Sequence, residues 1–298
     1  MLHTIENDYL KVTVSDHGAE LTSVYDKAQD FERIWCADPA VWNRHAPVLF
    51  PFVGKVKDGA YHYNGNTYAM KTQHGFARDA EFTCIEETTD SITHKLVYSD
   101  ETLEIYPFEF ELLITHRFDA ENPRLLHVTW AVKNLGSDEM LYSIGGHPGF
   151  QIPIEKNLKF EDYRIDFGED SKPRRILFSE DCFVLEEDEA FALEEGRYLN
   201  LEHNLFDDDA IVLKEMPREV TLESAKGSKK ITVAFPDMDY LGIWHWPHVE
   251  VDYVCIEPWS SLPSRKNVVE DLEKQADLLS LESGQEYTNT WILRSKEK

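Results

Sequence analysis

Short segments in which apolar and polar residues alternate dominate this chain, and they constrain its fold more than any other feature. Residues 10–14, 108–112 and 126–132 alternate with a period of two, which is typical of a β-strand with one buried face. Further strand-like segments lie at 176–178, 210–213, 220–222, 231–235, 241–244, 253–256 and 287–293. Asn-Gly at the centre of 61–68 favours a tight turn and predicts a β-hairpin there.

Segments with helical periodicity are few and short, and helices are expected only at 39–42 and 268–275. Many short strands over 298 residues predict stacked antiparallel sheets. The expected fold is therefore all-β, a large β-sandwich with a few short helices. Because no repeat, linker or low-complexity segment interrupts the pattern, residues 1–298 are expected to form one domain.

The charge of the chain excludes several classes of partner. A formal net charge of −26 repels phosphate backbones and anionic lipid surfaces, so nucleic acid and membranes are not expected partners. No apolar run has the length of a membrane span, and the first residues lack the features of a signal peptide, which predicts a cytoplasmic location. The 4 cysteines are widely spaced without a CxxC pair and are interpreted as reduced thiols.

Glu257 is the most unusual acidic residue, because it lies at the end of the apolar segment Cys255-Ile256 and precedes Pro258-Trp259. A carboxylate in apolar surroundings is costly to desolvate, and such groups concentrate at functional sites. His147 has comparable interest, because three glycines and a proline surround it in residues 144–150. We expect these glycines to let a ligand approach the backbone, with a structural turn histidine as the alternative. A carboxylate and an imidazole together indicate acid/base chemistry.

Two further segments supply polar groups. Gln73, His74 and Arg78 offer donors and acceptors suited to the hydroxyls of a sugar ring, while Arg44 and Lys55 flank an apolar strand. Alone, each segment could be an ordinary strand end with solvated charges.

Aromatic residues are concentrated near Glu257. Trp244 and Trp246 could form a wall against the C–H face of a sugar, although core packing is an equally good interpretation of either. His245 and His248 have the spacing of a metal pair, but a third ligand is not visible and Pro247 indicates a turn. We therefore predict no metal site.

Taken together, the runs at 47–55 (PVLFPFVGK), 73–79 (QHGFARD), 145–150 (GGHPGF) and 255–259 (CIEPW) resemble the aldose 1-epimerase (galactose mutarotase) superfamily, in particular its LacX-like branch. The resemblance covers nearly the whole chain and implies the galactose mutarotase-like supersandwich fold. It also implies that His147 is the general acid and Glu257 the general base.

The resemblance extends to substrate binding, with some departures. Gln73, His74 and Arg78 match the substrate-binding region of the family, and Asp209 is the candidate for its substrate-binding aspartate. Lys55 stands where enzymes acting on free galactose carry an arginine, and Arg44 is a match for the arginine of the hexose-6-phosphate branch. Since lysine and arginine are not interchangeable in reading a sugar, the departures bear on substrate identity.

The resulting hypothesis is a mutarotase that opens and closes an aldohexose ring without a cofactor. A cationic His147 protonates the ring oxygen while Glu257 takes the proton of the anomeric hydroxyl. A neutral hexose, galactose or glucose, is the predicted substrate, and a homodimer is left open. The alternatives are a non-catalytic sugar-binding or sugar-sensing protein, a hexose-6-phosphate mutarotase, and a glycoside hydrolase, which normally needs two carboxylates.

Overall fold

Two large antiparallel sheets carry most of the strands. The computed structural model describes residues 1–295. The nine-stranded sheet contains, in spatial order, β18 (Tyr198–Asn200), β15 (Arg164–Asp166), β20 (Glu219–Glu223), β21 (Lys230–Ala234), β25 (Glu286–Ser295), β11 (Leu125–Asn134), β10 (Phe110–Phe118), β9 (Ser91–Val97) and β8 (Thr83–Glu87). The eight-stranded sheet contains β17 (Val184–Ala190), β16 (Arg174–Phe178), β19 (Ile211–Lys214), β22 (Tyr240–Trp244), β23 (Tyr253–Trp259), β13 (Gly145–Gly146) and β5 (Val48–Leu49), with β14 (Gly149–Gln151) paired to β23.

Smaller elements complete the fold. The N-terminal four-stranded sheet contains β1 (Leu2–Glu6), β2 (Leu10–Ser15), β3 (Leu21–Asp26) and β4 (Phe31–Glu32). Two two-stranded sheets are formed by the hairpin of β6 (Ala60–Tyr63) with β7 (Asn66–Ala69), and by β12 (Met140–Tyr142) with the distant strand β24 (Leu279–Leu281). The helical segments are α1 (Asp100–Ile105) and the 3₁₀ turns η1 (Lys57–Gly59), η2 (Ala77–Asp79), η3 (Phe160–Asp162), η4 (His203–Phe206) and η5 (Leu272–Lys274).

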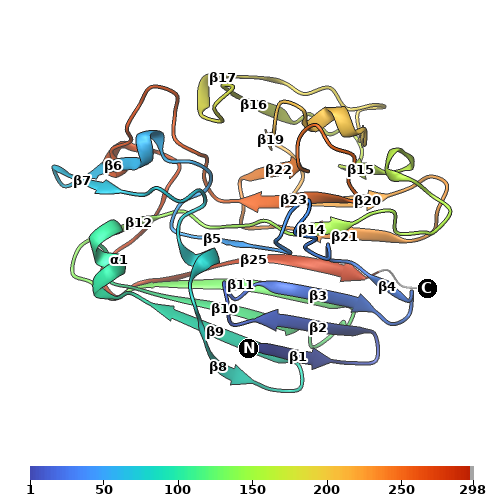
Figure 1. The fold of residues 1–298 in the computed structure, drawn as a ribbon, viewed down its shortest axis with the longest axis horizontal. Coiled ribbons are helices and arrows are strands. Elements are labelled where there is room, and N and C mark those ends of the chain that lie inside the picture. The colour runs from blue at the N-terminus through green and yellow to red at the C-terminus, as the bar shows by residue number, and fades with distance from the viewer. Residues whose placement is uncertain (296–298) are drawn as a thin grey trace.

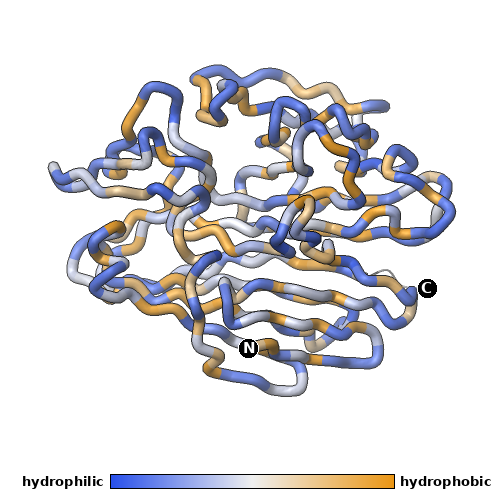
Figure 2. The backbone as a smooth tube through the Cα atoms, in the orientation of Figure 1, coloured by the Kyte–Doolittle hydropathy of each residue, from blue (hydrophilic) through white to orange (hydrophobic). Residues whose placement is uncertain are grey.

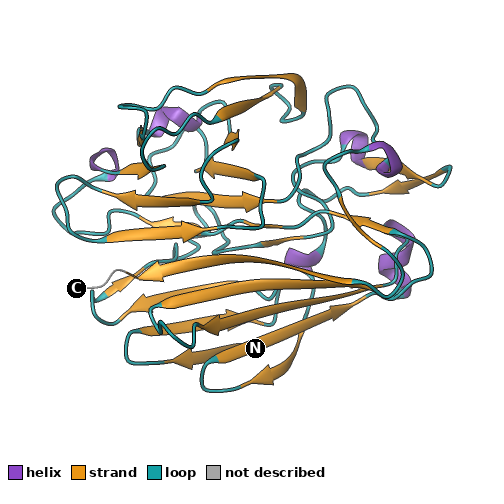
Figure 3. Ribbon diagram, turned by 180° about the vertical axis from the view of Figure 1, so that it is seen from behind, coloured by secondary structure: helices purple, strands orange, loops and turns teal. Residues whose placement is uncertain are grey.

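The sheets are stacked in layers. Figure 1 shows β16, β19, β22 and β23 of the eight-stranded sheet above the long strands β25, β11, β10 and β9 of the nine-stranded sheet. The N-terminal strands overlap the lower part of the nine-stranded sheet in this view, and β1 contacts β9. Seen from behind, the few helical turns lie in the connections between strands (Figure 3). No helix among the described residues is long and apolar enough to cross a membrane.

The alternating pattern of the sequence produces these layers, because it puts apolar side chains on one face of each strand. Every second residue of β10 and β11 is buried, and the pair is in register from Phe110 opposite Asn134 to Phe118 opposite Leu126. Apolar and polar residues alternate along the long strands in Figure 2. The predicted hairpin at 61–68 is formed by β6 and β7, with positive φ at Asn64 and Gly65 as a tight primed turn requires. The all-β, antiparallel prediction is confirmed.

Both helix predictions were wrong in extent. The segment 39–42 is only a turn, in which the backbone N–H groups of Val41 and Trp42 donate to Asp38, and the indole of Trp35 donates to the carbonyl of Trp42. The segment 268–275 contains only η5, because the carbonyl of Glu270 accepts from the distant backbone N–H of His62 at 2.7 Å and Asp271 forms a β-bridge with the same residue. Tertiary contacts thus override a weak local helical preference.

The sequence interpretation also missed the α-helix α1. Ser99 accepts from the backbone N–H of Thr102, while the Thr102 hydroxyl accepts from the backbone N–H of Ser99, so each satisfies a donor that the helix leaves free. The spacing of these two residues was the signal that could have revealed it.

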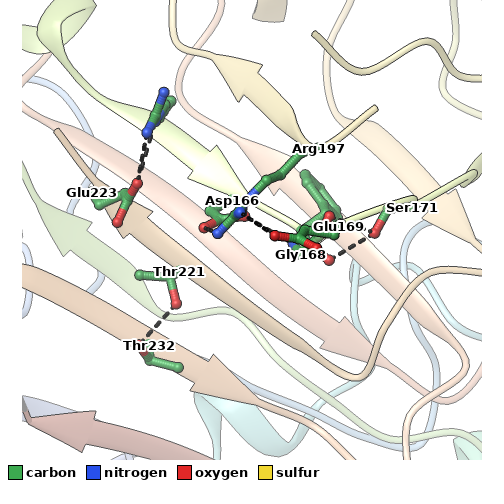
Figure 4. Close-up of polar contacts among 10 residues, drawn as sticks. Asp166, Gly168, Glu169, Ser171, Arg197, Thr221, Glu223 and Thr232 are labelled. Atoms are coloured by element: carbon green, nitrogen blue, oxygen red, sulfur yellow. Dashed lines mark hydrogen bonds and ion pairs between the residues drawn. The ribbon is translucent and has the colours of Figure 1, made fainter. Parts of the chain in front are cut away.

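Polar contacts hold the far edge of the nine-stranded sheet (Figure 4). Arg197, beside β18, donates from Nε and Nη2 to the two carboxylate oxygens of Asp166 on β15, both at 2.6 Å. On the neighbouring strands, the hydroxyls of Thr221 and Thr232 lie 2.9 Å apart. These contacts fix the register of an edge that is remote from the site described below.

One buried histidine makes stability depend on pH. His116 on β10 is fully buried, and both its ring nitrogens lack a hydrogen-bond partner among the described residues. Burial lowers its pKa to about 3, whereas an unfolded histidine takes up a proton near pH 6.5. Acidification between these values therefore favours the unfolded state, by up to about 1.4 kcal/mol per pH unit.

We accordingly expect His116→Phe to flatten the acid side of the stability curve. Denaturant unfolding at pH 7, 6 and 5 should show the free energy of unfolding of the variant falling less steeply than that of the unchanged protein, by about 1 kcal/mol per pH unit below 6.5. Parallel curves would show that His116 is protonated in the folded protein.

Candidate active site

One cavity of about 560 Å³ is lined by all ten residues that the sequence marked as candidates. They are Arg44, Lys55, Gln73, His74, Arg78, His147, Asp209, Trp244, Trp246 and Glu257. These residues come from segments up to 213 positions apart (257 − 44), so only the folding of the sheets brings them together.

Glu257 is held on β23, which is buried at every position from Tyr253 to Trp259. It lies opposite Gly242 of β22, and its side chain is 1% exposed. A Cβ atom at Gly242 would lie 2.9 Å from the Trp259 ring and 3.3 Å from Cβ of Glu257. The glycine therefore makes room for the carboxylate and the indole side by side.

His147 lies in the link between β13 and β14, where its backbone N–H donates to the carbonyl of Pro47 at 3.1 Å. We expected the neighbouring glycines to admit a ligand to the backbone, but aromatic rings occupy that space. A Cβ at Gly145 would lie 2.9 Å from Trp259, and one at Gly149 would lie 2.8 Å from Trp42. The glycines thus let two indoles pack closely around the segment that carries the imidazole.

The two side chains face each other. Nε2 of His147 lies 3.2 Å from Oε2 of Glu257, with the imidazole 10% and the carboxylate 1% exposed. The contact lacks the alignment of a hydrogen bond, and Oε2 has no hydrogen-bond partner within residues 1–295. Buried polar atoms are nearly always satisfied, so a carboxylate oxygen left without a hydrogen bond marks this pair as a candidate functional site.

Burial controls the protonation of the pair. It raises the pKa of Glu257 well above its ordinary value, with Asp209 acting in the same direction. Burial lowers the pKa of His147 to about 3, and Arg78 and Arg44 act in the same direction. Each shift favours the neutral form of its group, which runs against the cationic His147 expected from the sequence.

His74 is fixed by two contacts with Gly54. Its backbone N–H donates to the Gly54 carbonyl at 2.7 Å, and its Nδ1 accepts from the Gly54 N–H at 3.0 Å. Nε2 therefore carries the ring hydrogen, and the Gln73 side chain, whose amide nitrogen lies 3.2 Å away, can accept this hydrogen only through its amide oxygen. Burial lowers the pKa of His74, so this imidazole is a neutral donor within the cavity.

Cationic groups line the same cavity. Nη2 of Arg44 donates to Asp79 at 2.7 Å, and Nε of Arg78 lies 3.8 Å from the other oxygen of Asp79. Nε of Arg78 is buried without a hydrogen-bond partner in the described chain, and burial together with Arg44 lowers its pKa to about 10. Lys55 lies beside the Cys182 thiol.

Cys182 is a lining residue that the sequence interpretation left out. Its thiol donates to Oδ2 of Asp209 at 2.8 Å, and both residues have positive φ, 65° and 75°. Burial and Asp209 raise the pKa of this thiol to about 11. Backbone strain of this kind, here at two residues in contact, is concentrated at functional sites. No feature of the sequence around Cys182 predicts its place in the cavity.

Indole rings surround the imidazole. Trp244 lies edge-on to His147, with ring centres 5.5 Å apart, and Trp246 is half-exposed. Trp42, which sequence patterns assigned to a helix, lies 5.2 Å from His147 and stacks on Tyr253. The cavity therefore has an aromatic wall, which suits the C–H faces of a sugar ring.

The His245 and His248 pair does not converge. Nε2 of buried His245 lies 3.1 Å from Nδ1 of His203, whereas His248 is exposed beside Asp207 and lines the cavity. His147, Cys255 and Glu257 do bring three possible ligand atoms within 4.8 Å of one another. Burial raises the pKa of Cys255 well above its ordinary value, which disfavours the thiolate that a metal would need.

Comparison with known proteins relates this arrangement to one family. The family model described as aldose 1-epimerase matches residues 1–290. The plasmid-encoded protein LacX of Lactococcus lactis subsp. lactis is 32% identical over 299 residues, covering 97% of this chain and 98% of LacX.

Solved structures agree over the same length. A galactose mutarotase related enzyme from Lactobacillus acidophilus superposes with a TM-score of 0.91 at 34% identity, covering 100% of this chain and 98% of that one. A galactose mutarotase-like protein from Lactobacillus casei gives a TM-score of 0.91 at 30% identity, covering 99% of this chain and 100% of that one. The expected galactose mutarotase-like sandwich is therefore confirmed.

Proposed function

The chain belongs to the aldose 1-epimerase family, in its LacX-like branch, and we propose that it is a mutarotase that interconverts the α and β anomers of a hexose. The observation that carries the proposal is the buried contact of 3.2 Å between His147 and Glu257 at the cavity. An acid and a base side by side are what ring opening requires, because one oxygen must lose a proton while another gains one.

The reaction balances on these two groups alone. Glu257 takes the proton of the anomeric hydroxyl, C1 and O1 form a carbonyl, and the electron pair of the C1–O5 bond moves to the ring oxygen. His147 gives that oxygen a proton. After rotation of the aldehyde carbon, the same groups act in reverse and close the ring on the other face.

The resting pair already holds the one proton that this cycle needs. With Glu257 protonated and His147 neutral, passage of this proton to the imidazole through a hydroxyl group of the bound sugar yields the carboxylate and the imidazolium, since the direct contact of 3.2 Å lacks the alignment of a hydrogen bond. Hydroxyl groups of a bound sugar that donate to the carboxylate stabilise this charged form, since hydrogen bonds to the charged form favour it. Binding of the sugar thus makes Glu257 the base and His147 the acid.

The remaining cavity residues bind and orient the sugar. Nε2 of His74 donates toward the ring, Gln73 and Arg78 contact hydroxyls, and Asp209 accepts from them. Trp244, Trp246 and Trp42 cover a C–H face.

We propose a neutral hexose, glucose or galactose, as the substrate. All three cations have polar contacts of their own: Arg44 and Arg78 lie within ion-pair distance of Asp79, and Lys55 lies beside Cys182. The Nε atom of Arg78, which is buried without a hydrogen-bond partner in the described chain, favours the alternative of a phosphorylated hexose. Comparing kcat/KM for glucose and glucose 6-phosphate decides between them, since a preference above about tenfold for the phosphate, weakened by salt, would establish the alternative.

Polarimetry on freshly dissolved α-glucose and α-galactose tests the proposed function. We expect the optical rotation to reach its equilibrium value faster in proportion to protein concentration, with no change in the final value or in sugar composition. Binding of sugar without acceleration would make the protein a sugar binder or sensor. Release of a new sugar from a glycoside would make it a hydrolase.

The mechanism above needs only side chains, and a second prediction follows from this. Activity should survive exhaustive dialysis against a chelator in the presence of a reducing agent. Complete loss of activity that one added metal ion restores would refute the two-residue mechanism.

A further inference from the structure

A second cluster of metal-ligating side chains lies outside the cavity, between the N-terminal sheet and the edge of the nine-stranded sheet. His3 on β1, Cys84 on β8 and His94 on β9 each offer one ligand atom, and these three atoms lie within 4.8 Å of one another. None of the three lines the cavity. The reaction proposed above therefore leaves this cluster unexplained.

The register between β8 and β9 places the residues of this cluster on one face of the sheet. Cys84 and His94 are directly opposite each other on β8 and β9, so their side chains share a face. A register shift between Cys84 and Glu86 then pairs Glu87 with Ile92, which brings Glu87 rather than Glu86 onto that face. β1 lies against β9 and supplies His3 from the facing layer.

Two carboxylates orient the imidazoles. His3 lies 2.7 Å from Glu87 through Nδ1 and 2.9 Å from Asp16 through Nε2. Nε2 of His94 lies 3.1 Å from Asp16, whereas its Nδ1 is buried and without a hydrogen-bond partner within residues 1–295. Both ring nitrogens of His3 contact a carboxylate, so an ion would replace one of these two contacts. The contact that remains would then fix the ring, as carboxylates regularly do for the second nitrogen of a ligating histidine.

We propose that His3, Cys84 and His94 bind a Zn²⁺ ion that fastens β1 to β8 and β9. One thiolate and two imidazoles form a donor set that suits zinc, with the fourth position left for water or for a carboxylate oxygen of Asp16 or Glu87. On binding, the Cys84 thiol releases its proton to solvent as the sulfur–zinc bond forms, and two nitrogen–zinc bonds replace coordinated water.

The surroundings agree with this chemistry. Cys84 and His3 are partly exposed, so an ion can reach them from solvent, while His94 is fully buried.

Cobalt is the spectroscopic probe for the test. Metal-stripped protein titrated with Co²⁺ should develop a thiolate-to-cobalt charge-transfer band that saturates at one equivalent, and Zn²⁺ should abolish the band. Cys84→Ser should lose the band, while Cys36→Ser, which changes an exposed cysteine outside the cluster, should keep it. A titration without a saturable band, or a band that persists in Cys84→Ser, would overturn the proposal.

Thermal unfolding provides a second readout. Zn²⁺ at about one hundredfold excess over its dissociation constant should raise the Tm of the unchanged protein by about 5 °C and leave that of Cys84→Ser unaltered. A cobalt band lost in His147→Asn would place the ion on His147, Cys255 and Glu257 instead, and would refute the site proposed here. Either result is independent of whether the cavity catalyses mutarotation.

Discussion

Replacing Glu257 by glutamine, or His147 by asparagine, is expected to lower the catalysed rate of anomer interconversion by at least about 100-fold. Each change removes one of two groups that exchange protons with the sugar, which corresponds to at least roughly 2.7 kcal/mol in the barrier. Both replacements keep the approximate shape of the side chain. Because they remove an unsatisfied buried acid or imidazole, the fold should be retained.

The rates should be measured with far-ultraviolet circular dichroism on the same samples. Glu81→Gln and His17→Asn are matched controls, because they make the same kinds of change in an exposed pair outside the cavity, and both should keep full activity. A variant at position 257 or 147 with turnover close to that of the unchanged protein would remove that residue from the mechanism.

Alanine at Gly75 is expected to destabilise the protein by at least about 3 kcal/mol. Gly75 has φ of 71°, a conformation that L-residues rarely adopt, and an added Cβ would lie 2.1 Å from the carbonyl oxygen of Phe50. Phe50 is fully buried, so its backbone cannot move without disturbing the core. Since His74 precedes Gly75, the same displacement should move a cavity imidazole and reduce activity.

Gly65→Ala separates the cost of a positive φ at alanine from the cost of the steric clash. Gly65 has φ of 72°, but nothing lies within 4 Å of an added Cβ, so alanine there bears only the conformational cost of about 1 kcal/mol. Denaturant unfolding of both variants should therefore show Gly75→Ala to be the less stable by at least about 2 kcal/mol. Equal stabilities would mean that the chain at Phe50 yields to the new methyl group.

Alternation of apolar and polar residues was enough to predict the sheets, because burial of one strand face leaves a period of two in the sequence. The segments 126–132 and 61–68 correspond to β11 and to the β6–β7 hairpin. Helix predictions failed where long-range contacts decided the outcome, as at Glu270, whose carbonyl accepts from the backbone N–H of His62. The helical propensity of a short segment is too small to outweigh the free energy of such contacts.

Sequence motifs singled out residues that line one cavity, but they did not reveal the electrostatics of that cavity. Motif residues such as His147 and Glu257 stand out because glycine, proline and aromatic neighbours surround them. The protonation of His147 depends on burial and on Arg78 and Arg44, which no sequence pattern places beside it. Cys182 was missed for the same reason, since its contact with Asp209 exists only after folding.

The most direct test of the central claim is the rate at which the two anomers of glucose, and those of galactose, exchange at equilibrium. This rate is measured in NMR spectra by saturation transfer between the anomeric protons. The unchanged protein should raise the exchange rate of at least one of these sugars in proportion to its concentration. A His147→Asn/Glu257→Gln double variant should leave the rate at that of buffer. The account would be contradicted if the unchanged protein bound the sugar without accelerating exchange, or if the double variant accelerated exchange equally well.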